Sequence, residues 1–409
     1  MSSPYTDFEI VASDGLKLKN RTYHVPEGVE TKAKVIYVHG FSEHIAVYDH
    51  WLPLVANHGY ETTIFDQRGF GNTAVDSSHY GVTDEERAFS DLDTEIQTLF
   101  KDYTGPLVMW GHSMGGGIVL NYMVIGTFRD RIDLYIANSP CIIVHYKSRD
   151  WKSKLLPLMN ALYPKFRAPV AIDLKYLTND TEKLAEYPTD KLRHNIASVP
   201  LGLAMTNRGR RLLNPEFTNK IVDKPLLLCH GSLDYLCDHE ASRKFMDFAP
   251  LTDKTFKSYD GWPHELIHMI KRDKEYHLRD VVAWLDARIH LSALKEGIAA
   301  ALPTDEKVPP QVPVPVAPKE ESKEKPKEAP KEAPKEAPTE ELKEEPKQAP
   351  KEELKEAPTE EPKPKEETKE EPTDAPVEEP KEEPTEAPKQ APKQASKKGS
   401  KKGSKKGSK

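Results

Sequence analysis

Cysteine is the scarcest residue of this chain, which has only Cys141, Cys229 and Cys237 among its 409 residues. The three lie among apolar neighbours, and they are too few for a disulfide framework or a thiolate metal site. We therefore expect the protein in a reducing compartment, with no cofactor and no bound metal.

Long apolar runs and a basic surplus are also absent. Residues 1–7 lack the charged start and apolar core of a signal peptide, and no run approaches the length of a membrane span. Residues 1–302 hold 35 Lys and Arg against 39 Asp and Glu, which does not indicate a nucleic-acid partner. We expect a water-soluble cytoplasmic protein.

Aromatic residues are missing after Pro303, and 21 of the 35 prolines lie in residues 303–409. Such a segment cannot bury enough apolar surface to offset its chain entropy, which predicts a disordered Pro/Lys/Glu-rich tail. Seven lysines lie in the last 13 residues. A contact with anionic headgroups or a solubilising role would each explain this basic end. The folded domain then spans residues 1–302.

Short apolar runs alternate with helical patterns in residues 1–302. A hairpin is predicted around Asp14-Gly15. The runs closed by Gly, Asp or Asn, as buried strands are, occupy residues 33–40, 60–66, 106–111, 132–138 and 224–231, with helical patterns at 87–100, 114–124 and 276–289. This order predicts a mostly parallel central sheet with helices on both faces and a site at the carboxyl ends of its strands.

Residues 141–219 interrupt this alternation. Nearly eighty residues rich in Leu, Tyr, Met and Pro are too many for a plain connection between two strands. They predict an inserted helical cap, and the alternative is a set of surface helices without a role.

The strand ending at Trp110 leads into Gly111-His-Ser-Met-Gly-Gly-Gly117, which is the pattern G-x-S-x-G. On a strand, turn and helix this pattern forms a nucleophile elbow, in which glycines allow a turn sharp enough to expose the serine. The alternative is a Gly-rich turn that only packs a helix against the sheet. We favour Ser113 as the nucleophile.

A serine nucleophile needs a base and an acid that orients the base, which follow in the order Asp, then His, on this type of sheet. Asp234 follows the strand 225–230, and His264 lies on the loop after the strand 254–259. Asp238 is the competing acid, and we favour Asp234 because it is nearer to the strand end. The oxyanion hole needs two backbone N–H groups, for which Met114 and Phe41 are the candidates.

Residues 264–268 also contain H-E-x-x-H. On a helix, His264 and His268 would face one side and share a zinc ion, with Glu265 as the base. Pro263 permits a helix start at His264 at best, and Glu275 is the only acidic candidate for a third ligand nearby. A zinc hydrolase is therefore the less favoured alternative.

Together these motifs resemble the monoacylglycerol lipases of fungal type in the α/β-hydrolase superfamily, over about residues 5–290. The segments that carry the resemblance are His39–His44, Phe65–Gly71, Trp110–Gly117, Gly231–Asp238 and Tyr259–His264. The resemblance implies an α/β-hydrolase fold, the same catalytic and oxyanion residues, and cleavage of monoacylglycerol to glycerol and fatty acid through an acyl-enzyme.

The resemblance also implies that Glu43 and Tyr187 bind the glycerol end of the substrate. Two positions depart from the family pattern: Val47 stands where some relatives have Arg, and Ile267 stands where animal relatives have His, with His268 one residue later. The sequence therefore defines the residues that recognise the glycerol hydroxyls less clearly than the residues that carry out hydrolysis. A broader carboxylesterase or lysophospholipase on the same fold is the nearest alternative, and a non-catalytic lipid-binding protein is another.

Residues 151–163 of the predicted cap have apolar side chains at helical spacing, with lysines between them. One apolar face would line an acyl channel or rest on a lipid surface, and packing on the core is the alternative. From this pattern we expect peripheral contact with lipid droplets or endomembranes.

Overall fold

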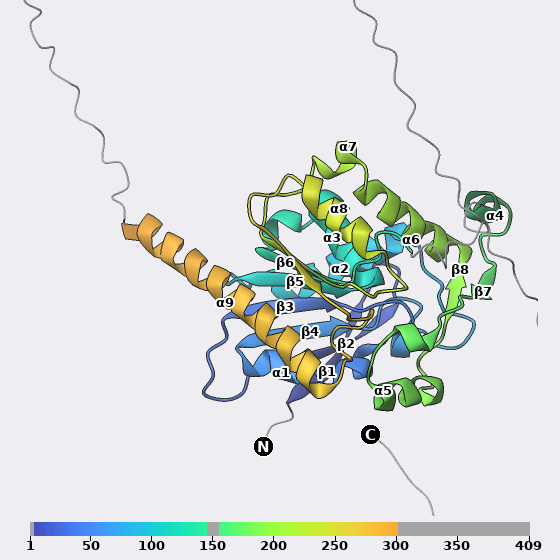
Figure 1. The fold of residues 1–409 in the computed structure, drawn as a ribbon, viewed down its shortest axis with the longest axis horizontal. Coiled ribbons are helices and arrows are strands. Elements are labelled where there is room, and N and C mark those ends of the chain that lie inside the picture. Colours follow the sequence, from blue (N-terminus) through green and yellow to red (C-terminus); the bar gives the residue numbers. More distant parts are fainter. Residues whose placement is uncertain (1–3, 145–154, 302–409) are drawn as a thin grey trace, which may run out of the picture. The chain divides into compact units, whose positions relative to one another are not determined.

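The computed structural model describes residues 4–144 and 155–301, and Figure 1 shows their helices and strands. The chain divides into two units, Met1–Pro313 and Val314–Lys409. The predicted tail, residues 303–409, lies outside the described residues, as do residues 145–154 of the predicted cap. In the described part of the chain, no helix is both long enough and apolar enough to cross a membrane.

The strands are β1 (Tyr5–Val11), β2 (Lys17–Tyr23), β3 (Ala33–Val38), β4 (Tyr60–Phe65), β5 (Leu107–His112), β6 (Leu134–Asn138), β7 (Arg167–Pro169), β8 (Ile196–Ser198), β9 (Leu226–Gly231) and β10 (Lys254–Tyr259). The α-helices are α1 (Leu52–Asn57), α2 (Glu85–Phe100), α3 (Met114–Ile125), α4 (Leu156–Leu162), α5 (Thr181–Glu186), α6 (Val199–Leu212), α7 (Pro215–Thr218), α8 (His239–Phe248) and α9 (Lys271–Ala301). The short 3₁₀ helices are η1 (Ile45–Tyr48), η2 (Gly71–Thr73), η3 (Arg129–Arg131), η6 (Leu174–Tyr176) and η7 (Tyr187–Thr189).

Eight of the described strands form one sheet in the order β1-β2-β4-β3-β5-β6-β9-β10. β1 and β2 form the predicted hairpin, in which Gly15 has a φ of 86°. From β4 to β10 every neighbouring pair is parallel, so the carboxyl ends of these strands meet at one edge. The predicted α/β-hydrolase architecture with a mostly parallel sheet is confirmed.

Helices cover both faces of this sheet, because successive strand residues point to opposite sides. On β5, Leu107 and Met109 pack with α2, α3 and α8, whereas Val108 and Trp110 pack with α1 and α9. Trp110 is fully buried, and its ring meets that of Trp51 edge to face, 5.0 Å between centroids. Replacement of Trp110 by Ala would lower the free energy of unfolding by about 3–5 kcal/mol. Both faces of β5 are therefore fixed by packing, and β5 ends one residue before Ser113.

The chain between β6 and β9 carries α4, α5, α6 and α7, and Figure 1 shows α4, α5 and the β7–β8 pair beside the sheet rather than in it. The described part of the predicted insertion therefore contains four α-helices and one short strand pair. β7 and β8 pair antiparallel and were not predicted, because strands of three residues are too short for a visible apolar alternation. Within the predicted helical stretch 151–163, the described helix α4 covers only Leu156–Leu162.

Candidate active site

Ser113 is the single residue between β5 and α3, and its backbone is strained. Its φ of 53° and ψ of −115° are rare for a residue with a side chain, and such strain persists where the surrounding structure enforces it. A Cβ at Gly115 would lie 2.0 Å from the carbonyl oxygen of Val38, and one at Gly111 would lie 2.5 Å from that of Gly115. The glycines of the motif are therefore needed for the close approach of α3 to the sheet.

Asp234 and His264 form the central hydrogen bond of the site. The Nδ1 atom of His264 lies 2.6 Å from Oδ2 of Asp234, and both residues are buried. Oδ2 also contacts Nε2 of His230 at 2.9 Å, and Oδ1 accepts bonds from the backbone N–H groups of Leu236 and Cys237, both at 2.8 Å. These partners satisfy a carboxylate that would otherwise be costly to bury.

The pKa values of Asp234 and His264 shift in opposite directions, that of the carboxyl downward and that of the imidazole upward. Burial by itself would raise the pKa of Asp234, but the neighbouring His264 and His230 hold it well below its usual range. Burial opposes protonation of His264, but Asp234 raises its pKa above 6.5. The arrangement therefore stabilises an imidazolium beside a permanently ionised carboxylate, which a serine hydrolase needs after the base has taken the proton.

Asp238, the competing acid, has another role in the structure. Its side chain caps α8 by accepting bonds from the backbone N–H groups of Glu240 and Ala241, at 2.9 and 3.3 Å. An Asp at an N-cap satisfies N–H groups that the helix leaves unpaired. This geometry favours Asp234 as the acid that orients His264.

Ser113 and His264 line one cavity of about 680 Å³, which suits a ligand with one long chain. The wall combines Glu43 and His112 with apolar side chains, many from the insertion. The lining residues are Phe41, Glu43, His112, Ser113, Cys141, Val144, Pro169, Val170, Ala171, Ile172, Leu177, Met205, Leu236, Cys237, His264 and Glu265.

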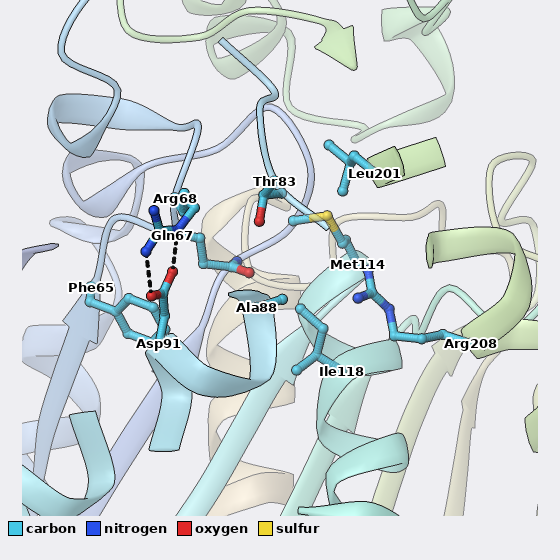
Figure 2. Close-up of a pocket in the computed structure, with 10 residues that line it drawn as sticks. All are labelled: Phe65, Gln67, Arg68, Thr83, Ala88, Asp91, Met114, Ile118, Leu201 and Arg208. Carbon is cyan, nitrogen blue, oxygen red and sulfur yellow. Dashed lines mark hydrogen bonds and ion pairs between the residues drawn. The ribbon is translucent and has the colours of Figure 1, made fainter. Parts of the chain in front are cut away.

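The two predicted oxyanion donors lie beside this cavity. Met114 is the first residue of α3, so its N–H has no partner within the helix. Phe41 lines the cavity, and its ring packs edge to face on Phe70 at 5.5 Å. Met114 also borders a small space of about 10 Å³, which Figure 2 shows with its lining residues. Arg68 and Asp91 form an ion pair there, 2.8 Å between Nη2 and Oδ1. That space holds about one water molecule and no substrate.

Glu43 lies between the oxyanion loop and His112. It accepts hydrogen bonds from the N–H of Gly40 and from the hydroxyl of Tyr48, and its Oε1 lies 3.8 Å from Nε2 of His112. Burial would raise the pKa of Glu43, but His112 and Arg193 lower it on balance. Glu43 is therefore an ionised acceptor in the cavity wall, as binding of a hydroxyl group requires. Its role in substrate binding stays a prediction.

The chain matches known hydrolases. Residues 29–269 match the family described as "Serine aminopeptidase, S33". The monoglyceride lipase of Saccharomyces cerevisiae is 34% identical over 67% of this chain and 91% of its own length. The putative monoglyceride lipase of Schizosaccharomyces pombe is 32% identical over 62% of this chain and 67% of its own length. The crystal structure of a soluble variant of the S. cerevisiae enzyme, in complex with a substrate analog, superposes with a TM-score of 0.65 at 30% identity, covering 70% of this chain and 98% of that one.

The chain belongs to the monoglyceride lipase family. It is thus a serine hydrolase of the ester-cleaving type, which confirms the resemblance seen in the motifs. The individual roles of Ser113, Asp234 and His264 stay predictions, which the hydrogen bond between Asp234 and His264 and the cavity shared by Ser113 and His264 support.

Tyr187, expected from the resemblance to bind the glycerol end, lines a cavity other than the one that Ser113 lines, and its role in substrate binding stays a prediction. Its hydroxyl donates a hydrogen bond to Glu265, and it lines a second cavity of about 320 Å³ together with Arg193 and His268. Val47, the position where some relatives have Arg, lines the same cavity. The guanidinium of Arg193 lies 3.9 Å from the centre of the Tyr187 ring. Arg193 therefore brings a positive charge near Val47, which no local pattern in the sequence indicates.

The helical H-E-x-x-H arrangement is not formed. α9 begins at Lys271, and residues 264–268 lie in turns before it. The carboxylate of Glu265 is bonded to Tyr187, and the ring of His268 packs on that of His50 at 4.9 Å. The premise of the zinc hydrolase, two histidines on one helical face, is therefore wrong.

Two contributions to the site are not predicted by the motifs of the sequence. His230 supports Asp234 from within β9, where its only local signal is a polar residue in an apolar strand. Cys141 and Cys237 lie together in the cavity wall although they are far apart in the sequence.

Proposed function

We propose that this enzyme hydrolyses monoacylglycerols to glycerol and free fatty acid. The observation that carries the proposal is the composition of the main cavity. Ser113, His264 and Glu43 supply a reactive and polar end, whereas Val170, Met205 and their neighbours supply an apolar wall for one acyl chain. The family relatives named as monoglyceride lipases support the same substrate class.

In the proposed reaction, Oγ of Ser113 attacks the ester carbonyl while His264 takes the hydroxyl proton. Asp234 holds the imidazole, and the N–H groups of Phe41 and Met114 receive the negative charge on the carbonyl oxygen. His264 then gives its proton to the glycerol oxygen, which leaves an acyl-enzyme. Water activated by His264 hydrolyses this ester and releases the fatty acid. Glu43 accepts a hydrogen bond from a glycerol hydroxyl.

We also propose that the enzyme meets its substrate at a lipid surface from the cytoplasmic side. Exposed apolar side chains lie on α4 and the segment after it. The exposed fraction is 59% for Leu158, 61% for Leu162 and 65% for Tyr163. Val170, on the same insertion, lines the cavity. An apolar surface close to the cavity would bring the chain of a monoacylglycerol directly to Ser113. Lipid droplets and endomembranes are the expected surfaces.

A hydrolysis screen tests the substrate. Monoacylglycerols, diacylglycerols, triacylglycerols and lysophospholipids are compared at equal interfacial area, with a soluble butyrate ester as reference. We expect monoacylglycerol to be cleaved fastest and triacylglycerol far more slowly, because the cavity has room for one chain. Equal rates for lysophospholipid and monoacylglycerol would support a broader carboxylesterase or lysophospholipase instead.

The serine mechanism is tested against a zinc hydrolase. A fluorophosphonate should label Ser113 and abolish activity, and Ser113→Ala should be inactive and unlabelled. Strong chelation should not lower the rate of the untreated enzyme. Activity that survives Ser113→Ala and is lost on chelation would contradict the proposal.

A further inference from the structure

Two thiols and an imidazole lie in the wall of the main cavity, and the carboxylate of Asp234 lies beside them. Donor atoms of Asp234, Cys237 and His264 lie within 4.8 Å of one another, and all three residues are buried. The thiols of Cys141 and Cys237 are close enough for each to change the pKa of the other. Val144, just after Cys141, pairs with Cys237 in an isolated antiparallel bridge, so the backbone itself holds the two cysteines together.

This donor set is the one that zinc prefers. Zn²⁺ binds Cys sulfur, His nitrogen and Asp oxygen in tetrahedral sites, whereas Ca²⁺ and Mg²⁺ take oxygen ligands. Bond lengths of about 2.0–2.3 Å place the donors of a tetrahedral site about 3.5 Å apart. Oδ2 of Asp234 and Nδ1 of His264 are already 2.6 Å apart, so an ion bound by both would replace their hydrogen bond, and Cys141 supplies the fourth donor.

The charges and the access route also suit a zinc ion. Asp234 is ionised, and each thiol gives its proton to water when it binds the metal, so the ligands carry three negative charges against two positive ones. Cys141, Cys237 and His264 all line the cavity that contains Ser113, so an ion enters by the path of the substrate.

We propose that Cys141, Cys237, Asp234 and His264 form an inhibitory zinc site. A zinc ion there occupies the base and the carboxylate that orients it, so Ser113 has no acceptor for its proton. Inhibition is reversible, because each thiol takes a proton back from water when the ion leaves and no other covalent bond of the protein changes. The site differs from the H-E-x-x-H pattern: it shares only His264 with that pattern and takes no part in catalysis.

The first test measures zinc inhibition of the full chain on a soluble butyrate ester at buffered free Zn²⁺. We expect at least a tenfold loss of rate that EDTA reverses, and no loss with Mg²⁺ or Ca²⁺ at the same concentration. Cys141→Ala and Cys237→Ala should each raise the zinc concentration for half-inhibition at least tenfold, relative to the activity of the same variant without zinc.

The chain offers a matched control in Cys229. This third cysteine is buried in β9, and its thiol contacts the hydroxyl of Tyr259 rather than the cavity. Burial raises its pKa to about 12. Cys229→Ala should therefore be inhibited by zinc like the native chain. His268→Asn should also keep its zinc sensitivity, because His268 is not a ligand of the proposed site.

The second test does not depend on hydrolysis, so it fails or succeeds independently of the proposed function. The full-length Ser113→Ala chain is titrated with Co²⁺, and we expect thiolate-to-cobalt charge-transfer absorption together with the visible bands of a tetrahedral site. Both signals should be lost in the Ser113→Ala/Cys237→Ala double variant. Both should remain in the Ser113→Ala/Cys229→Ala double variant. Zinc inhibition that is unchanged in the Cys141→Ala/Cys237→Ala double variant, or that disappears only in His268→Asn, would overturn the proposal.

Discussion

Tyr187 donates its hydroxyl hydrogen to Glu265, the residue directly after His264 in the chain. The backbone N–H of Glu265 also donates to the carbonyl oxygen of Leu177, at 2.8 Å. Tyr187 and Leu177 belong to the insertion, so the insertion is bonded to the loop that carries His264. Burial raises the pKa of Glu265 to about 7, and the charge of this carboxyl therefore changes near neutral pH.

Replacing Glu265 by Gln should shift the pH dependence of hydrolysis. Only neutral His264 accepts a proton, so kcat/KM should rise as pH rises through the pKa of His264. Asp234 raises this pKa most, and Glu265 and Glu43 add to it. Glu265→Gln removes one negative neighbour, so the rising limb should move to lower pH while most activity at high pH remains.

The measurement is the pH profile of kcat/KM for a soluble ester. Asp260→Asn is the control, because Asp260 is an exposed carboxylate on the same loop. A shift to higher pH in Glu265→Gln, or an equal shift in Asp260→Asn, would show that Glu265 does not act on His264 through its charge.

Asp234 and Asp238 should respond to substitution in opposite ways. Asp234→Asn removes the charge that orients and stabilises protonated His264, and kcat should fall about 10⁴-fold with little change in KM. Asp238→Ala should keep kcat near that of the native enzyme but lose about 1 kcal/mol of unfolding free energy, because α8 loses its N-cap. Steady-state kinetics and denaturant unfolding separate the two effects. A large loss of kcat in Asp238→Ala alone would reverse the assignment.

Local sequence signals predicted the framework of the site but not its side-chain contacts. The elbow at Ser113 and the strand ends before Asp234 and His264 are local patterns, because glycine geometry and strand order decide them. The contacts of Arg193 with Tyr187 and of Cys141 with Cys237 depend on how the insertion packs on the sheet. No pattern within a short window of sequence carries that information.

The tail should be dispensable for folding and for hydrolysis of a dispersed short-chain ester. None of its residues after Pro303 is aromatic, and it holds 21 of the 35 prolines of the chain. A protein that ends at Leu302 keeps α9 whole, because that helix ends at Ala301. We expect the melting temperature and kcat/KM of this protein to equal those of the full chain. A melting temperature lower by several degrees would show that the tail packs on the domain.

The apolar surface of α4 should control access of long-chain substrates. Leu155 and Leu158 are exposed, and the neighbouring residue Leu156 approaches Gly202 of α6, so one side of α4 packs and the other is free. Leu155→Asp combined with Leu158→Asp charges the free side. Hydrolysis of long-chain monoacylglycerol should slow far more than that of the soluble butyrate ester, because a charged surface does not enter a lipid interface.

Val29→Asp is the matched control for this pair. Val29 is an exposed apolar residue just before β3, at the end of the sheet opposite to Ser113. Its replacement adds an acidic group to the surface without touching the insertion, so both substrates should react as in the native enzyme. Binding to vesicles, measured by sedimentation, should fall in the α4 variant and not in Val29→Asp. If the two substrates slow equally in the α4 variant, α4 supports the fold of the insertion and does not deliver the lipid.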